Sequence, residues 1–226
     1  MKVSKFFVVA AAFCAPTLFA GQNPADRLTD ASDVLRDMMK MDDKGIPQDL
    51  IDKAQCVVVI PGMKKGAFIV GAKYGKGFTS CRKPGSGWSA PAAVSVEGGS
   101  VGFQIGGSEQ DVIMLVMNEN GAKKLQESKF TIGGEATAAA GPVGRDASAQ
   151  TDAQMRAEIL SYSRARGLFA GISLQGATLR PDDEANQELY GRALTNKEIL
   201  MGKVKPPASA AGFLALLNRQ SMHKEG

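Results

Sequence analysis

Cationic side chains beside glycine-rich segments are the residues of this sequence whose types and spacing point to chemistry. They follow short apolar runs, where Pro61-Gly62 and Pro84-Gly85 predict that the chain turns. Lysine and arginine at neighbouring strand ends would attract phosphate groups, each contributing about 1 kcal/mol near an anionic membrane. Solvated lysines that merely protect the sheet edges are the alternative interpretation. The candidate patch comprises Lys64, Lys65, Lys73, Tyr74, Lys76, Arg82 and Lys83.

A second cationic pair lies in the stretch from Ser161 to Thr178, where arginine, aromatic and small residues alternate with glycine. Arg164 and Arg166 are two positions apart, so an extended backbone projects both guanidinium groups from one face. The alternation of apolar residues after Gly167 predicts a strand. This pattern is typical of binding more than of catalysis. A core strand with a solvated arginine pair at its entrance explains the pattern equally well.

The sequence has few residues that could serve as catalytic groups or as metal ligands. The one histidine, His223, is the fourth residue from the end, so neither Ser-His-Asp nor Cys-His chemistry has a base. The few cysteines do not complete a zinc site, and no calcium-binding loop is present. The segment Gly71–Gly77 lacks the spacing of a nucleotide phosphate loop. We expect no cofactor, no metal and no enzyme, with carboxylate-only catalysis as a distant alternative.

Helical patterns at both ends enclose a central region of strand patterns, which predicts an α+β fold. The strands predict an antiparallel sandwich or a partly closed barrel, with the N-terminal and C-terminal helices packed on it. The first helix, from Asn23-Pro24 to about Met41, should pack on the core because its polar face is more acidic than basic. Predicted strands cover 56–60, 67–72, 77–82, 88–96, 100–106, 111–118, 130–141, 157–166 and the run after Gly167; further helices cover 48–54, 119–128, 181–190, 195–201 and 208–218.

Residues 1–20 predict a secretory signal peptide. Lys2 and Lys5 precede an apolar run that ends near Phe19, and cleavage is expected after Ala20. Residues 21–226 have the length of one domain. The formal net charge of +4 falls to +2 without the two leader lysines, an excess too small to predict a nucleic-acid partner.

Removal of the leader leaves two cysteines, Cys56 and Cys81. In an oxidising compartment, a disulfide between them is the simplest prediction. Loop entropy predicts that a ring of this size stabilises the fold by about 3.5 kcal/mol. Two buried thiols remain the alternative, since the sequence does not give the separation of the two residues.

Three sequence blocks resemble the signatures of the SYLF family, in the family's order. They are GWSAPAAV (Gly87–Val94), GGEATAAAGPVGR (Gly133–Arg145) and SYSRARGLFAGISLQG (161–176), and the resemblance covers residues 46–190. The resemblance implies lipid binding, because eukaryotic members bind phosphoinositides and actin and bacterial members are secreted lipid-binding proteins. Gln175 departs from the pattern, where Glu is expected, so no carboxylate role is carried over to that position.

The resemblance and the cations together predict a non-enzymatic module that recognises anionic phospholipid headgroups at a membrane surface. The signal and the family indicate secretion into the periplasm, where actin is not met. The alternative is a structural or interaction protein of the cell envelope that binds a protein partner and no specific lipid. The guanidinium of Arg145, in the turn after Gly141-Pro142, suits a phosphate or, slightly favoured, an internal carboxylate. The predicted lipid-binding residues are the candidate patch with Arg145, Arg164 and Arg166.

Overall fold

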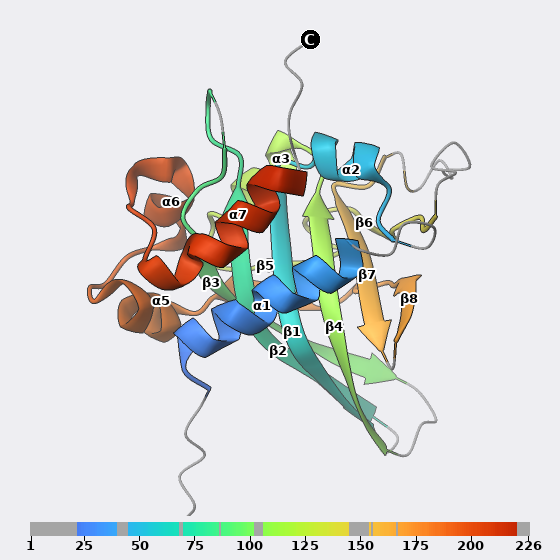
Figure 1. Ribbon diagram of the computed structural model, residues 1–226. Coiled ribbons are helices and arrows are strands. Elements are labelled where there is room, and N and C mark those ends of the chain that lie inside the picture. The colour runs from blue at the N-terminus through green and yellow to red at the C-terminus, as the bar shows by residue number, and fades with distance from the viewer. Residues whose placement is uncertain are drawn as a thin grey trace, which may run out of the picture.

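Within the residues that the computed structural model describes, nine strands form one strongly curled sheet that helices from both ends of the chain cover (Figure 1). These residues are 22–39, 45–67, 70–85, 87–101, 106–144, 154, 156–165 and 167–220. The predicted α+β class is confirmed, and a single curled sheet corresponds to the partly closed barrel and not to the sandwich. The predicted signal peptide lies outside the described residues.

The strands follow the order β5-β9-β3-β2-β1-β4-β7-β6 across the sheet, and β8 also pairs with β7. Every pairing is antiparallel except the parallel pair β6–β7, which the sequence did not predict. The strand bounds are β1 Cys56–Ala67, β2 Val70–Cys81, β3 Ala92–Val101, β4 Gly106–Val116, β5 Phe130–Thr131, β6 Ala138–Ala140, β7 Ile159–Ala165, β8 Leu168–Gly171 and β9 Thr178–Pro181.

Helices lie before the sheet and after it in the chain, as predicted. Asn23 accepts a hydrogen bond from the Ala25 amide at the start of α1, Asn118 caps α3, and Thr195 forms a capping box with Glu198 at α6. The helix bounds are α1 Pro24–Met39, α2 Gln48–Lys53, α3 Glu119–Lys124, α5 Asp183–Tyr190, α6 Asn196–Glu198, the π-helix η2 Ile199–Lys203, the 3-10 helix η3 Ala208–Ala210 and α7 Ala211–Gln220.

The turn predicted at Pro61-Gly62 is wrong, because β1 continues through these residues to Ala67. Gly62 adopts a left-handed φ of 54°, and the register of β1 against both neighbours shifts here, as in a β-bulge. The break between the predicted strands 67–72 and 77–82 is likewise wrong, since Lys73–Lys76 lie inside β2. The far ends of β1, β2 and β4 therefore extend beyond the helices (Figure 1). A bulge accommodates the Pro-Gly pair without ending the strand.

Other boundaries differ from the predictions as well. The predicted strand 100–106 begins inside β3 and ends at the first residue of β4. The predicted strand 130–141 is two short strands, β5 and β6, because Gly133 has a φ of 83° and the chain turns there. The sequence predicts a helix that starts at Pro181 and no strand at β9. Pro181 instead ends β9 at the sheet, and Asp182 caps α5. Short strands held only by pairing carry too little periodicity to identify.

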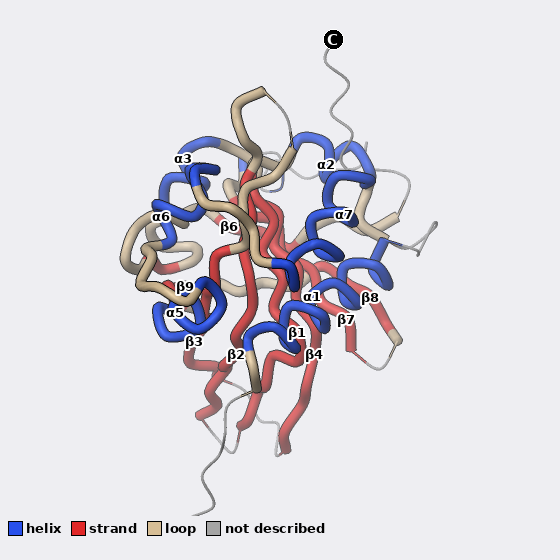
Figure 2. Tube along the Cα trace, turned by 60° about the vertical axis from the view of Figure 1, so that its left-hand side comes forward, coloured by secondary structure: helices blue, strands red, loops and turns tan. Residues whose placement is uncertain are grey.

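Two apolar cores lie on the two faces of the sheet. The alternation along β1 sends Val57 and Val59 to the core beneath the helices α1, α2 and α7, and Val58 and Ile60 to the core inside the curl. Figure 2 shows α1, α2 and α7 grouped on one side of the strands. Leu28, with its neighbours on the apolar stripe of α1, is fully buried, so the predicted packing of this helix on the core is confirmed.

The predicted disulfide between Cys56 and Cys81 is present. The two residues are opposite one another in the register of β1 and β2, with their Cα atoms 3.9 Å apart. The bond closes the β1–β2 hairpin at the end remote from Lys64, Lys65 and Lys73 and next to Arg82. The pairing of the strands thus supplies the proximity that the sequence alone could not give.

Candidate functional site

The candidate lysines of β1 and β2 lie on both faces of the sheet. In the register of the two strands, Lys64 is opposite Tyr74 and Lys65 is opposite Lys73. Opposite residues share a face and adjacent residues alternate. Lys64 and Tyr74 therefore project on the face that α1 covers, and Lys65 and Lys73 project on the inner face of the curl. The single patch predicted from the sequence is divided between these two faces.

Lys65 and Lys73 form a like-charge pair directly across the two strands. Burial, and then the positive charge of Lys65, lower the pKa of Lys73. Among the described residues, neither lysine has a hydrogen-bond or ion-pair partner. Their cross-strand neighbours, Ser108 beside Lys65 and Gly98 beside Lys73, are small. Like charges at opposite positions destabilise a sheet, so this pair would favour an anion between its ammonium groups.

Tyr74 lies beside this pair on the other face of β2. Its side chain is 44% exposed, which is high for a large aromatic residue in a strand. Its cross-strand neighbour Glu97 is not free, because Glu97 forms an ion pair with Arg180 of β9. An exposed aromatic ring next to cations suits the boundary between water and lipid.

Lys76, in contrast, is engaged inside the fold. Its Nζ atom lies 2.8 Å from Oδ2 of Asp182, and the same carboxylate lies 3.8 Å from the guanidinium of Arg27 on α1. Burial lowers the pKa of Lys76, but the hydrogen bond and charge of Asp182 outweigh burial and raise it. Arg27 and Asp182 are both buried. Lys76 therefore links β2 to α1 and to the start of α5.

Arg82 is also occupied by internal contacts. Its Nε atom donates to the carbonyl of Ala54 at 2.8 Å, and Nη2 donates to the carbonyl of Asp52 at 2.9 Å. The guanidinium lies 4.7 Å from the centre of the Trp88 ring. These carbonyls belong to the end of α2, where a cation complements the helix dipole. The neighbouring Lys83 is exposed, and its aliphatic stem passes beside Gly202 of η2.

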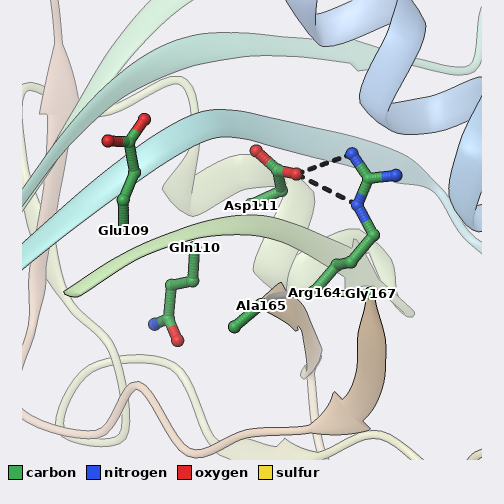
Figure 3. A pocket seen from close by; sticks show the side chains of 6 residues that line it. All are labelled: Glu109, Gln110, Asp111, Arg164, Ala165 and Gly167. Atoms are coloured by element: carbon green, nitrogen blue, oxygen red, sulfur yellow. Dashed lines mark hydrogen bonds and ion pairs between the residues drawn. The ribbon is translucent and has the colours of Figure 1, made fainter.

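Arg164 connects β7 to α1 and β4, and Figure 3 shows its contact with Asp111 of β4. Its Nε and Nη2 atoms donate to Oδ2 of Asp111 at 3.1 and 2.8 Å, and Nη1 donates to Oδ2 of Asp37 at 2.7 Å. The hydrogen bond to Asp37 and those to Asp111 raise the pKa of Arg164, although burial opposes them. Its charge is therefore paired with carboxylates inside the fold. The other predicted arginines, Arg145 and Arg166, lie outside the described residues.

A cleft opens where α1, β1, β4 and β7 meet around Arg164. Its larger lobe has a volume of about 460 Å³, and a smaller lobe of about 250 Å³ adjoins it at Glu109, Asp111 and Arg164. Figure 3 shows Glu109 and Asp111 on one side of β4 and Gln110 on the other. The larger lobe is lined by Gln22, Asp30, Asp33, Val34, Pro61, Gly62, Lys64, Glu109, Asp111 and Arg164.

The acidic partners of this region were missed from the sequence. Asp37 and Asp111 lie 127 and 53 positions before Arg164 in the chain. The acidic face of the first helix was visible as a pattern, but no spacing indicated which residue meets Arg164. Glu109 had no signal as a site residue, because only the pairing of β1 with β4 brings it to Lys64. Asp182 lies at the start of a predicted helix, and only the fold brings it to Lys76 of β2.

Two of the sequence blocks that resemble the SYLF signatures meet at β7. Gly141 packs on the ring of Tyr162, where an added Cβ would lie 2.1 Å from Cζ. A Cβ on Gly171 would similarly lie 2.1 Å from the carbonyl oxygen of Gly141. Tyr162 also stacks on Phe169, with ring centres 5.5 Å apart. These close contacts set the position of β7, which carries Arg164.

Two further observations concern the described residues only. Among them, no helix has both the length and the apolar character needed to cross a membrane. In the same part of the chain, no group of three or more His, Cys, Asp or Glu side chains is arranged to hold a metal ion.

Comparison with known proteins identifies relatives across most of the chain. The Ysc84 family model, described as "Las17-binding protein actin regulator", matches residues 97–220. SH3 domain-containing YSC84-like protein 1 of Xenopus laevis is 36% identical over 178 residues, which are 78% of this chain and 53% of that protein. Protein YSC84 of Saccharomyces cerevisiae is 31% identical over 201 residues, 85% of this chain and 43% of that protein. The chain thus spans about half the length of the curated relatives it matches.

Proposed function

Because the chain belongs to the Ysc84 family, the SYLF family that its three sequence blocks resemble, we propose that it is a non-enzymatic module that binds anionic phospholipid at a membrane surface. The observation that carries the proposal is the Lys65–Lys73 pair. The two cations are opposite one another on β1 and β2, and neither has an anionic partner among the described residues. A lipid phosphate between them relieves their repulsion.

The strength of this contact follows from the number of free cations. Lys65 and Lys73 contribute about 1 kcal/mol each at an anionic surface. The sum of about 2 kcal/mol supports only weak, salt-sensitive attachment. The exposed ring of Tyr74 adds an apolar contribution at the interface. Lys76, Arg82 and Arg164 add little, because internal carboxylates and carbonyls already hold them.

The place where the module meets lipid follows from the first residues of the chain. A signal peptide over residues 1–20 would export the protein, and a bacterial source would place it in the periplasm. The Cys56–Cys81 disulfide supports this proposal, because disulfides persist in oxidising compartments. Membrane lipid headgroups would then be the accessible anionic partner.

A vesicle co-sedimentation series tests the proposal. The protein should bind vesicles of phosphatidylcholine mixed with phosphatidylglycerol and should not bind vesicles of phosphatidylcholine alone. It should dissociate as the salt concentration rises. The variant Lys65→Gln/Lys73→Gln should lose most of this binding while its melting temperature stays equal or rises, because the like-charge pair is gone. A loss of stability together with binding would instead indicate a structural role for the lysines.

The matched control is Lys129→Gln/Lys197→Gln, which removes two exposed lysines from other parts of the surface. This control should bind as the unmodified protein does. Equal losses of vesicle binding in both double variants would show that binding depends on net charge and not on the position of the lysines. Binding that persists in high salt and ignores Lys65 and Lys73 would contradict the proposed surface.

A protein-binding module is the second candidate function. It is favoured by the printed description of the family as an actin regulator and by the name of a yeast relative, LAS seventeen-binding protein 3, which is 31% identical over 184 residues. Failure to bind any vesicle, combined with co-sedimentation with purified actin filaments, would favour this function over lipid binding.

A further inference from the structure

The cleft between α1 and the sheet has a fixed inner wall. Asp111 accepts a hydrogen bond from the amide of Gly62 at 3.0 Å and two more from Arg164. Arg164 in turn donates to Asp37 of α1. These contacts join β1, β4, β7 and α1, so the wall is held from four elements. A volume of about 460 Å³ lies within the range of pockets that take small ligands.

At the rim of this cleft, Glu109 and Lys64 carry opposite charges that do not pair. The two residues are directly opposite in the register of β4 and β1. Opposite charges at such positions normally attract. Yet no ion pair or hydrogen bond joins them, and neither has another partner within the described part of the chain. The rim therefore presents one free carboxylate and one free ammonium a short distance apart.

Gly62 explains why the carboxylate of Glu109 lies where it does. A Cβ on residue 62 would lie 2.6 Å from Oε1 of Glu109, so the carboxylate occupies the space that a side chain would fill. The left-handed φ of 54° is also suited to glycine. The bulge thus places an acceptor over the floor of the cleft, beside the hydrogen-bonded Asp111.

The lining also determines which charges a ligand should carry. Arg164 is paired with two carboxylates, Asp37 and Asp111, which together exceed its charge by one, and Asp30 and Glu109 face one free cation, Lys64, among the lining residues described. Asp30 accepts only from the uncharged Gln22, and Asp33 is paired with Arg36. A simple anion would be repelled by the carboxylates. A simple cation would be attracted by the carboxylates but would leave Lys64 without an anionic partner.

We propose that this cleft binds a small zwitterion that carries a primary ammonium and a phosphate group. The ammonium donates to Glu109, with Asp30 further along the wall, and the phosphate accepts from Lys64. The headgroup of phosphatidylethanolamine has this chemistry, and so does free phosphoethanolamine. The site rests on the proposed function only in that the protein meets phospholipid, and it differs from the Lys65–Lys73 pair in face and in the ligand it selects.

The first experiment uses soluble probes, followed by NMR titration or calorimetry. O-phosphoethanolamine should bind, and ethanolamine or inorganic phosphate alone should bind more weakly. Glu109→Gln and Lys64→Gln should each weaken O-phosphoethanolamine binding about tenfold, as expected for the loss of one charged hydrogen bond. Glu188→Gln and Lys129→Gln, at exposed sites elsewhere, are the matched controls. Ethanolamine that binds as tightly as the whole zwitterion would overturn the role of the phosphate.

The second experiment separates the lipid source and the two sites. Replacing part of the phosphatidylcholine in neutral vesicles by phosphatidylethanolamine should increase binding, and Glu109→Gln should abolish that increase while binding to phosphatidylglycerol remains. Lys65→Gln/Lys73→Gln should keep the increase caused by phosphatidylethanolamine and should lose most of the binding to phosphatidylglycerol. Soluble probe binding without the vesicle gain would assign the cleft to the free zwitterion. If neither the probe nor phosphatidylethanolamine binds, the inference is wrong, whatever happens with phosphatidylglycerol.

Discussion

Glycine at two positions explains at the residue scale how separated sequence blocks meet. Gly141 allows the ring of Tyr162 to lie against the backbone, and Gly171 allows a second backbone to approach Gly141. Tyr162 is fully buried, and burial raises the pKa of its hydroxyl group. The side chain therefore acts as an uncharged packing element that holds β7 in place.

Replacing Gly141 with alanine should destabilise the protein. The new Cβ would overlap the Tyr162 ring, and overpacking of this kind typically costs about 1–3 kcal/mol. Urea unfolding measures the loss. Gly134→Ala in the same block is the control, because its Cβ would meet ordinary contacts no nearer than 3.5 Å. Equal stability of the two variants would show that the ring moves aside freely.

Glu158 predicts how stability responds to acid. Burial would raise its pKa, but hydrogen bonds from Asn120 and from the amide and hydroxyl of Thr137 hold the pKa below the ordinary 4.5. The carboxylate form is thus favoured in the folded state. Its contribution is present above pH 4.5 and is lost as the pH falls through the lower, folded value.

The variant Glu158→Gln should therefore be less stable than the unmodified protein at neutral pH, and this difference should shrink as the pH falls below 4.5. Urea unfolding across this range measures both effects. A difference that stays constant with pH would mean that the carboxylate charge does not contribute.

At the scale of elements, two charged contacts hold α1 on the sheet. Near its start, Arg27 lies by Asp182, and near its end, Asp37 accepts from Arg164. Between them the apolar stripe of α1 is buried in the core beneath the helices. The acidic outer face of this helix also forms one wall of the cleft. The helix thus has a structural role and a place in the candidate site.

The variant Arg164→Lys should loosen the end of α1. A lysine cannot make the bidentate contact with Asp111 and reach Asp37 at the same time. Hydrogen exchange of the amides in the last turn of α1 should become faster, while exchange in α7 stays the same. Arg180→Lys, which alters a more exposed ion pair with Glu97, is the control. Unchanged exchange in α1 would show that apolar packing alone holds it.

On the scale of the whole molecule, the central strands β1 and β2 connect the two cores and are cross-linked by the disulfide. The bond restricts the unfolded chain, and the loop-entropy model gives about 3.5 kcal/mol for this ring. Cys56→Ala/Cys81→Ala should lower the free energy of unfolding by up to this amount, as measured in urea.

Reduction of the unmodified protein should produce a similar loss, and the double variant should not respond to the reductant. Thiol titration of the unreduced, unfolded protein should find neither Cys56 nor Cys81 free. Two free thiols would contradict the disulfide and remove the expected difference in stability.

The sequence by itself determined the class of the fold, the packing of α1 on the core and the choice of cysteine partners. These features depend on local periodicity and on the small number of candidates. The sequence also identified the cations of β1 and β2, but it predicted a break in each strand. In the structure β1 continues through a bulge, and β2 is continuous.

Only the tertiary structure decided which of these cations are free. Register places Lys65 against Lys73 and separates both from Lys64, while Lys76, Arg82 and Arg164 meet partners from distant parts of the chain. Strand pairing also forms the cleft by bringing Glu109 to Lys64 and Asp111 to Arg164. The physical reason is that an ion pair depends on distance in space, and residues on different strands carry no sequence signal of that distance.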